Sequence, residues 1–126
     1  MIAIAVIMTC YNRVETTLQC LQNLFSITLP NNYKIDVFLV DDNSPDQTGK
    51  IIKNKYPEIH VISGIGNLYW SGGMRLSWNA ASANFYPFYL WLNDDTFLHQ
   101  YALQELIGVS NLNNDKAIIC GATQSK

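Results

Sequence analysis

The residues best suited to chemistry stand where apolar runs end. The triplet Asn93-Asp94-Asp95 directly follows the apolar run 88–92. Two adjacent carboxylates beside a buried strand repel each other and lose solvation, and a hard divalent cation relieves both costs. Mg²⁺ typically binds through one or two carboxylates together with substrate phosphates. The triplet therefore indicates either a metal site or a pair of helix-capping aspartates, and its spacing leaves both open.

A second acidic pair, Asp41-Asp42, follows the strand predicted at 35–40. One of the two carboxylates can order the loop by accepting backbone amides. The other can accept an N–H group from the edge of a nucleobase. Ser44 is a candidate cap for the next helix, so the acidic pair is less needed for capping. We therefore favour a binding role for one of the two aspartates.

Other candidate residues carry weaker signals. Tyr11 follows the first apolar run and suits either stacking on a base or ordinary partial burial. Gly72-Gly73, at a predicted helix start, can present backbone amides to an anion or form a flexible turn. The loop 64–67 has two glycines but lacks the third of a dinucleotide-binding fingerprint, and it does not follow the first strand.

The apolar pattern predicts the strands and helices that must position these residues. The run 2–8 is short, continuous and rich in Ile and Val, as expected of a fully buried strand. Val14, Leu18, Leu21 and Phe25 fall on one face of a helix. Further strands are predicted at 35–40, 59–62, 88–92 and 117–120, and further helices at about 44–55, 72–84 and 100–109.

Local signals predict how two of the helices begin. Asn12 and Glu15 are spaced as a helix cap and its capping-box partner. Ser44 is expected to cap the second helix, with Pro45 at its first position and Gln47 completing a Ser-x-x-Gln box.

The predicted order β-α-β-α-β-α-β-α-β indicates a three-layer α/β fold, with a mostly parallel sheet and helices on both faces. A chain of 126 residues fits a single domain, 1–126. In open parallel sheets, ligands bind beyond the carboxyl ends of the strands. The polar clusters described above all follow predicted strands, so we expect a ligand site at that edge.

Composition excludes several classes of protein. A net charge of −2, with 14% charged residues, argues against nucleic-acid binding and against a basic membrane-surface patch. A hydrophobic content of 48% argues against disorder. Three scattered cysteines favour a reducing compartment. The apolar opening 1–8 lacks the features of a signal peptide, and no apolar run approaches the ~20 residues of a transmembrane helix. We expect a cytoplasmic protein whose membrane association, if any, depends on segments outside this chain.

Four motifs together resemble the family 2 glycosyltransferases with the GT-A fold. They are 5–13 (AVIMTCYNR), 40–48 (VDDNSPDQT), 66–75 (GNLYWSGGMR) and 91–96 (WLNDDT), in the family's order and at sensible separations. The resemblance extends over essentially all 126 residues but covers only the nucleotide-binding half of the usual family domain. It implies inverting transfer of a sugar from a nucleotide diphosphate-sugar to a saccharide or lipid-linked acceptor, with Mn²⁺ or Mg²⁺ as cofactor. Synthesis of a polysaccharide is the process that the resemblance suggests.

The resemblance also implies roles for individual residues. Thr9 and Tyr11 match positions that line the base pocket. Asp42 matches the carboxylate that accepts the base N–H, which suits uracil or thymine. Asp94 matches a ribose-contacting position, and Asp95 matches the last, metal-binding residue of the family's D-x-D motif.

This chain departs from the family pattern at Asn93, the first position of that motif. Asparagine can bind a metal through its amide oxygen but brings no charge, so we expect metal affinity to depend mostly on Asp95. Asn67 and Arg75 belong to the third motif, where Arg75 suits either a phosphate contact or the surface. The family's general base is an Asp or Glu in the acceptor half, expected beyond Lys126. The chain is therefore expected to be a truncated donor half, inactive alone.

Two other functions stay open at this stage. A nucleotidyltransferase usually carries a glycine-rich, basic loop after its first strand, where this chain has 9–13 (TCYNR). A receiver-like signalling module would have its acidic pair after the first strand and a lone Asp after the third. Here the acidic residues follow the second and fourth predicted strands, so both alternatives fit less well than a glycosyltransferase.

Overall fold

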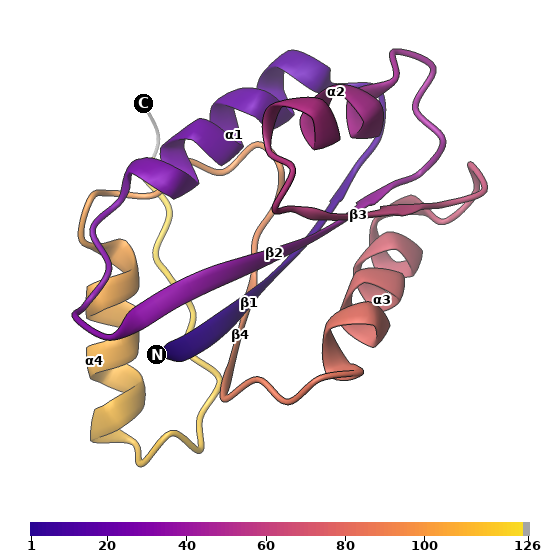
Figure 1. Ribbon diagram of the computed structural model, residues 1–126. Helices are drawn as coiled ribbons and strands as arrows, with labels where there is room; N and C mark the ends of the chain where they lie inside the picture. Colours follow the sequence, from indigo (N-terminus) through magenta and orange to yellow (C-terminus); the bar gives the residue numbers. More distant parts are fainter. Residues whose placement is uncertain (125–126) are drawn as a thin grey trace.

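The computed structural model describes residues 1–124 as a single parallel sheet with helices packed on it (Figure 1). The strands are β1 (Ile2–Cys10), β2 (Tyr33–Asp41), β3 (His60–Ser63) and β4 (Phe88–Trp91). The helices are α1 (Val14–Ser26), α2 (Thr48–Lys55), α3 (Tyr69–Ser82) and α4 (Ala102–Leu112). The strand order is β3-β2-β1-β4 and every pair is parallel, which confirms the predicted α/β class.

The side chains of β1 alternate between two apolar cores. Val6 and Met8 face α1 and α2, in a core that includes Leu21 and Ile52. Residues of opposite parity face α3, in a core with Met74 and Ala81. Burying each large aliphatic side chain contributes roughly 1.5–3 kcal/mol, so both faces of the sheet need their helices. Figure 1 shows α1 and α2 on one side of the sheet and α3 on the other.

The direction of the chain across the sheet reverses at β1. The chain passes outward from β1 to β2 and β3, and α3 then carries it back to place β4 on the other side of β1. Helix α1, which follows β1, and helix α3, which leads into β4, therefore lie on opposite faces of the sheet. In parallel sheets such a switch point leaves a crevice at the carboxyl ends of the two strands, where ligands bind.

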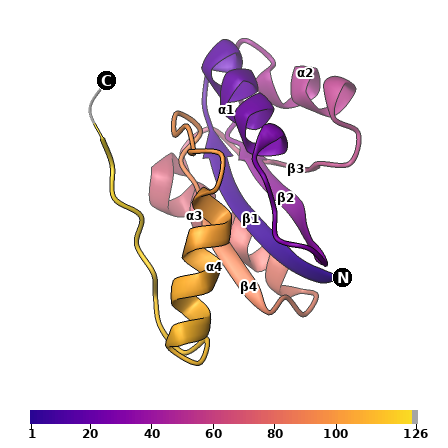
Figure 2. The same ribbon diagram turned by 90° about the vertical axis from the view of Figure 1, so that its left-hand side faces the viewer.

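The fifth strand predicted at 117–120 does not form within the described residues. After α4, Asn114 and Asp115 both adopt left-handed backbone conformations, with φ at 55°, and reverse the chain. Residues 117–121 then follow an extended path that lines a groove with β4 and α4, without pairing in the sheet (Figure 2). Ile118 is exposed, so the apolar run lacks the burial that a central strand needs.

The capping box predicted from Asn12 and Glu15 is wrong. Asn12 lies outside α1 with a φ of 52°, and no side chain at the position before Val14 caps the helix. Instead, the backbone N–H of Val14 donates to Asp46 Oδ2 at 3.0 Å. Helix α1 is therefore capped by a residue from the loop before α2, a contact that short-range sequence patterns do not reveal.

The start of α2 also differs from the prediction. The helix begins at Thr48, because Gln47 adopts a left-handed conformation with a φ of 59°. Asp46 accepts the Thr48 N–H at 3.0 Å, whereas the Ser44 hydroxyl donates to Asp41 and does not cap the helix. The predicted Ser44–Gln47 box therefore does not form.

A search of the described residues found no helix long and apolar enough to cross a membrane.

Candidate functional site

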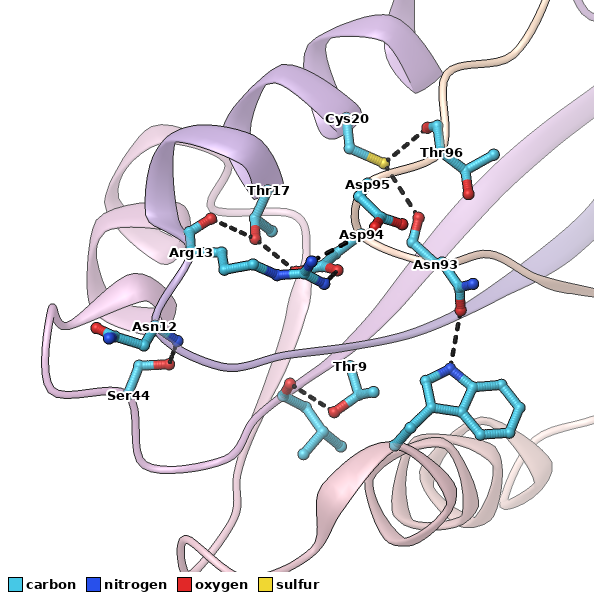
Figure 3. Close-up of polar contacts among 12 residues, drawn as sticks. Thr9, Asn12, Arg13, Thr17, Cys20, Ser44, Asn93, Asp94, Asp95 and Thr96 are labelled. Carbon is cyan, nitrogen blue, oxygen red and sulfur yellow. Dashed lines mark hydrogen bonds and ion pairs between the residues drawn. The ribbon is translucent and has the colours of Figure 1, made fainter. Parts of the chain in front are cut away.

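Three polar segments meet at one edge of the sheet, beyond the carboxyl ends of β2, β1 and β4. Thr9 and Tyr11 come from the end of β1, Asp42 follows β2, and Asp94 and Asp95 follow β4. Because β1 lies between β2 and β4, the three segments are neighbours at this edge. Figure 3 shows the part of it that contains Thr9, Asp94 and Asp95.

Both members of the acidic pair order loops. Asp41 accepts the backbone N–H of Gly49 at 2.9 Å, in the first turn of α2. Asp42 is buried and accepts the backbone N–H groups of Gly66 at 2.7 Å and Leu68 at 2.9 Å. Asp42 thus fixes the loop between β3 and α3. A carboxylate offers about four acceptor positions, so these two bonds leave Asp42 with capacity for a further donor.

Arg13 joins the two aspartates that follow β4. Its guanidinium forms an ion pair with Asp94 and lies 3.4 Å from Asp95 Oδ2 (Figure 3). The Thr17 hydroxyl donates to Asp94 Oδ2 at 3.0 Å. Burial raises the pKa of Asp94, and the contacts with Thr17 and Arg13 oppose that rise. Donors from Thr17 and Arg13 therefore surround the buried carboxyl group of Asp94.

The two aspartates differ sharply in accessibility. The side chain of Asp94 is 2% exposed, whereas that of Asp95 is 52% exposed. The predicted ribose contact, Asp94, is therefore occupied by Arg13 and Thr17, and that role stays a prediction. Asp95, the predicted metal ligand, presents an accessible carboxylate at the crevice.

The oxygen atoms at this edge fit a metal ion that takes part of its coordination from a substrate. No group of three acidic, histidine or cysteine side chains that could enclose a metal occurs in the described part of the chain. Asp95 offers one accessible carboxylate, and Asn93 Oδ1 accepts the indole N–H of Trp70 at 2.8 Å. Mg²⁺ usually keeps several non-protein oxygen ligands and binds through one or two carboxylates plus phosphates.

The remaining predicted residues lie at the surface of the same edge. Tyr11 is exposed after β1, and its ring is free to stack on a planar group. Asn67 and Arg75 are exposed, and the side chain of neither has a hydrogen bond or ion pair with the described residues. The anion site suggested for Gly72-Gly73 is wrong, because α3 begins before these glycines and the Gly72 N–H donates to the carbonyl of Leu68.

Sequence patterns missed Arg13, Thr17 and Asp46 as parts of the site. Each acts through a contact more than thirty residues away along the chain: Arg13 and Thr17 on Asp94, and Asp46 on Val14. The available signal was the position of Arg13 in the polar segment 9–13 that follows the first predicted strand, whereas Asp46 lay within the predicted helix 44–55 and carried no such signal.

Comparison with known proteins identifies the family of the chain. The sequence matches the description "Glycosyl transferase family 2" over residues 5–126. The chain belongs to this family. A search of curated proteins gives no significant match. Family membership favours a glycosyltransferase over the nucleotidyltransferase and the receiver-like module considered above.

Solved glycosyltransferases share the fold of this family 2 chain. The structure of S. aureus TarS 1-349 in complex with UDP-GlcNAc has a TM-score of 0.68 and 21% identity, over 90% of this chain and 32% of that one. The mannosyltransferase PcManGT from Pyrobaculum calidifontis, in complex with GDP-Man and Mn²⁺, has a TM-score of 0.69 and 16% identity, over 82% of this chain and 31% of that one. This chain therefore has the GT-A fold and spans about a third of the length of these proteins.

Proposed function

We propose that this chain forms the donor-binding part of an inverting glycosyltransferase that uses a UDP- or dTDP-sugar and a divalent metal. One observation carries the proposal. In a family 2 chain, the residues suited to base and metal binding meet at the switch point of the sheet, with Thr9, Tyr11 and Asp42 on the β1–β2 side and Asp95 on the β4 side. Crevices of this kind bind nucleotides in parallel α/β sheets.

The base would lie between Tyr11 and Asp42. The exposed ring of Tyr11 provides a stacking surface, and Asp42 provides an acceptor for a ring N–H. Uracil and thymine each present one such N–H between two carbonyl groups. Guanine also has a ring N–H, and PcManGT was solved with GDP-Man, so the nucleotide must be tested directly.

The diphosphate would lie near Asp95. Asp95 would hold Mn²⁺ or Mg²⁺ from the protein side, while phosphate oxygens complete its coordination. When bound, the metal supplies a Lewis acid that stabilises the charge developing on the leaving diphosphate. Arg13 lies 3.4 Å from Asp95 Oδ2 and places a second positive charge at the same place. Arginine is well suited to phosphate oxygens, so Arg13 can contact the diphosphate while it holds Asp94.

Inverting transfer also needs a general base for the acceptor hydroxyl. Among the described carboxylates of this edge, those held by donors of the protein are Asp41, Asp42, Asp46 and Asp94. Asp95 is assigned to the metal. We assign the base to the acceptor-binding part of the enzyme, together with the saccharide or lipid-linked acceptor.

The three cysteines are free, which agrees with the proposed cytoplasmic location.

Calorimetry with UDP, dTDP and GDP, each with and without Mn²⁺, tests the proposal. We expect UDP or dTDP to bind more tightly than GDP, and to bind more tightly with Mn²⁺ than without it. Absence of binding by all three nucleotides would refute the donor site. Equal nucleotide affinity with and without Mn²⁺ would refute the role of Asp95 but not that of the base pocket.

A further inference from the structure

All three tryptophans of the chain form one cluster beside the proposed metal site. The ring centroids of Trp70 and Trp91 lie 6.2 Å apart with their planes at 62°, and those of Trp78 and Trp91 lie 5.3 Å apart. Trp78 also stacks on Tyr89 at 4.6 Å, so Trp91 packs against a ring that is itself held in place. Trp70 and Trp91 are nevertheless 52% and 50% exposed. Two large, supported aromatic rings thus face solvent at the end of β4.

A hydrogen bond links this cluster to the polar triplet that follows β4. The indole N–H of Trp70 donates to Asn93 Oδ1 at 2.8 Å. An indole N–H can only donate, so the amide oxygen of Asn93 must face it and the NH₂ group must point elsewhere. Within the described residues that NH₂ group has no hydrogen-bond partner. Trp70 therefore orients two free N–H donors beside the exposed rings.

These groups form what we call the aromatic corner: Trp70, Trp91 and the amide of Asn93. The two half-exposed rings meet at 62°, so together they offer apolar ring surface in two orientations. The amide at their junction adds donors for a hydroxyl oxygen. A pyranose ring has this chemistry, with C–H groups on one face and hydroxyl groups around the rim. Ligand sites commonly combine aromatic walls with a few well-placed polar groups.

We propose that the aromatic corner binds the pyranose ring of the donor sugar. The inference rests on the proposed function, which places the metal-bound diphosphate at Asp95, two residues after Asn93. The sugar is bonded to the distal phosphate and must lie close to it. The base is at the opposite end of the diphosphate, toward Tyr11 and Asp42 on the far side of β1. The position of the corner on β4 therefore fits the sugar and not the base.

The test compares nucleotide diphosphates with the corresponding nucleotide sugars. The probes are UDP with UDP-GlcNAc, and GDP with GDP-Man, each titrated with Mn²⁺ into the wild-type chain and into Trp70→Ala. We expect Trp70→Ala to weaken binding of the preferred nucleotide sugar by about three- to tenfold and to leave the nucleotide diphosphate within about twofold. Phe85→Ala removes an exposed aromatic side chain from the loop between α3 and β4, and it should change neither affinity.

Tryptophan fluorescence provides a second readout, because every tryptophan of the chain belongs to this cluster. The nucleotide sugar should change the emission more than the nucleotide diphosphate does under the same Mn²⁺ concentration. Trp70→Phe keeps an aromatic face but removes the N–H that orients Asn93. It should therefore lose less sugar affinity than Trp70→Ala, and it also serves if circular dichroism shows that the alanine variant is unfolded.

The outcomes separate this inference from the proposed function. Equal weakening of UDP and UDP-GlcNAc by Trp70→Ala would assign the corner to the base or diphosphate and overturn the inference. Unchanged affinity for both ligands would also overturn it, while the donor site stood. If the wild-type chain binds none of the four probes and does not bind dTDP either, the proposed function fails and the inference fails with it.

Discussion

Gly73 in α3 packs directly against the side chain of Thr9 at the end of β1. A Cβ atom at position 73 would lie 2.1 Å from Thr9 Oγ1 and 2.7 Å from Thr9 Cβ, well inside van der Waals contact. Only glycine allows α3 to approach the sheet this closely beside the proposed base pocket. The position of the helix and the position of Thr9 are therefore coupled.

This contact predicts that Gly73→Ala disturbs both stability and binding. The added methyl group must push α3 or Thr9 away, because the short threonine side chain has little room to yield. We expect a loss of about 1–3 kcal/mol in the free energy of unfolding, as for other overpacked sites, and weaker nucleotide binding. Urea unfolding and calorimetry measure the two effects.

Gly108→Ala is the matched control for this substitution. Gly108 lies inside α4, and a Cβ atom there would meet nothing within 4 Å. Alanine in an open helical position should stabilise the chain by roughly 0.5–1 kcal/mol. Equal effects of the two substitutions would show that the contact between Gly73 and Thr9 is unimportant.

The sequence alone allowed prediction of the sheet and of the edge that carries the site. The runs 2–8, 35–40, 59–62 and 88–92 all overlap observed strands. The continuous apolar run 2–8 belongs to β1, which is buried on both faces, whereas β3 and β4 lie at the edges of the sheet and are partly buried. The order of elements then predicted parallel pairing, and parallel pairing places the polar segments at one edge. The start of α3 was predicted three residues late, because Gly72-Gly73 resembled a turn whereas the helix passes through both glycines.

The contacts that complete the site could not be predicted in this way. Asp46 caps α1, Arg13 holds Asp94, and Trp70 orients Asn93, each across a large separation in sequence. Capping patterns describe neighbours within one turn, so they assigned local partners that the structure does not use. The short apolar run 117–120 has the pattern of a strand but pairs with no other strand among the described residues.

Asp42→Asn should reduce both nucleotide affinity and loop order. The substituted amide keeps one oxygen acceptor, but its NH₂ group would face a backbone N–H of Gly66 or Leu68. A hydrogen bond to a charged acceptor contributes about 1.5–3 kcal/mol, so nucleotide affinity should fall roughly ten- to hundredfold. Calorimetry measures the affinity, and thermal unfolding measures the loop contribution.

Asp41→Asn is the comparison for this prediction. Asp41 also binds backbone amides, at Ser44 and Gly49, but it serves the loop before α2. This variant should lose stability with little change in nucleotide affinity. If Asp41→Asn abolished binding and Asp42→Asn left it intact, the roles of the two aspartates would be reversed.

Asp95→Ala should remove the effect of Mn²⁺ on nucleotide diphosphate binding. The carboxylate is half exposed and its contact with Arg13 is long, so its loss should hardly change the melting temperature. Affinity should become the same with and without Mn²⁺, as measured by calorimetry. Glu105→Ala removes an exposed carboxylate from α4 and should keep the metal effect. A folded Asp95→Ala variant with unchanged metal dependence would exclude Asp95 as the principal ligand.

Only one of the three cysteines should react quickly with a thiol reagent in the native chain. Cys120 is exposed, whereas Cys10 and Cys20 are buried. Burial raises the pKa of both inner thiols, that of Cys20 to about 12, which leaves them protonated and unreactive at neutral pH. Titration with a chromogenic disulfide should show one fast thiol before denaturation and all three after it. Cys120→Ser should remove the fast phase, and a fast phase that persists would place an inner cysteine at the surface.

The contact between Asp46 and Val14 predicts that α1 is stabilised from outside its own sequence. Asp46 accepts the backbone N–H groups of both Val14 and Thr48, so Asp46→Ala should destabilise the chain by about 0.5–2 kcal/mol, the usual cost of losing a helix cap. Glu15→Ala is the matched control, because Glu15 belongs to the local capping box that does not form. Urea unfolding compares the two variants, and an equal loss from Glu15→Ala would restore the local box as the cap.

The same carboxylate predicts a pH dependence with a definite sign. The hydrogen bond from the Thr48 hydroxyl, followed by those from the Val14 and Thr48 amides, lowers the pKa of Asp46 in the folded chain. A carboxyl group whose pKa is lowered by folding stabilises the fold above its unfolded pKa, near 4, and loses that contribution as the pH falls through its folded pKa. The difference in unfolding free energy between wild type and Asp46→Ala should therefore be constant near neutral pH and shrink below about pH 4. A difference that grew on acidification would mean that the Asp46 carboxylate opposes folding, and the cap would have to be sought elsewhere.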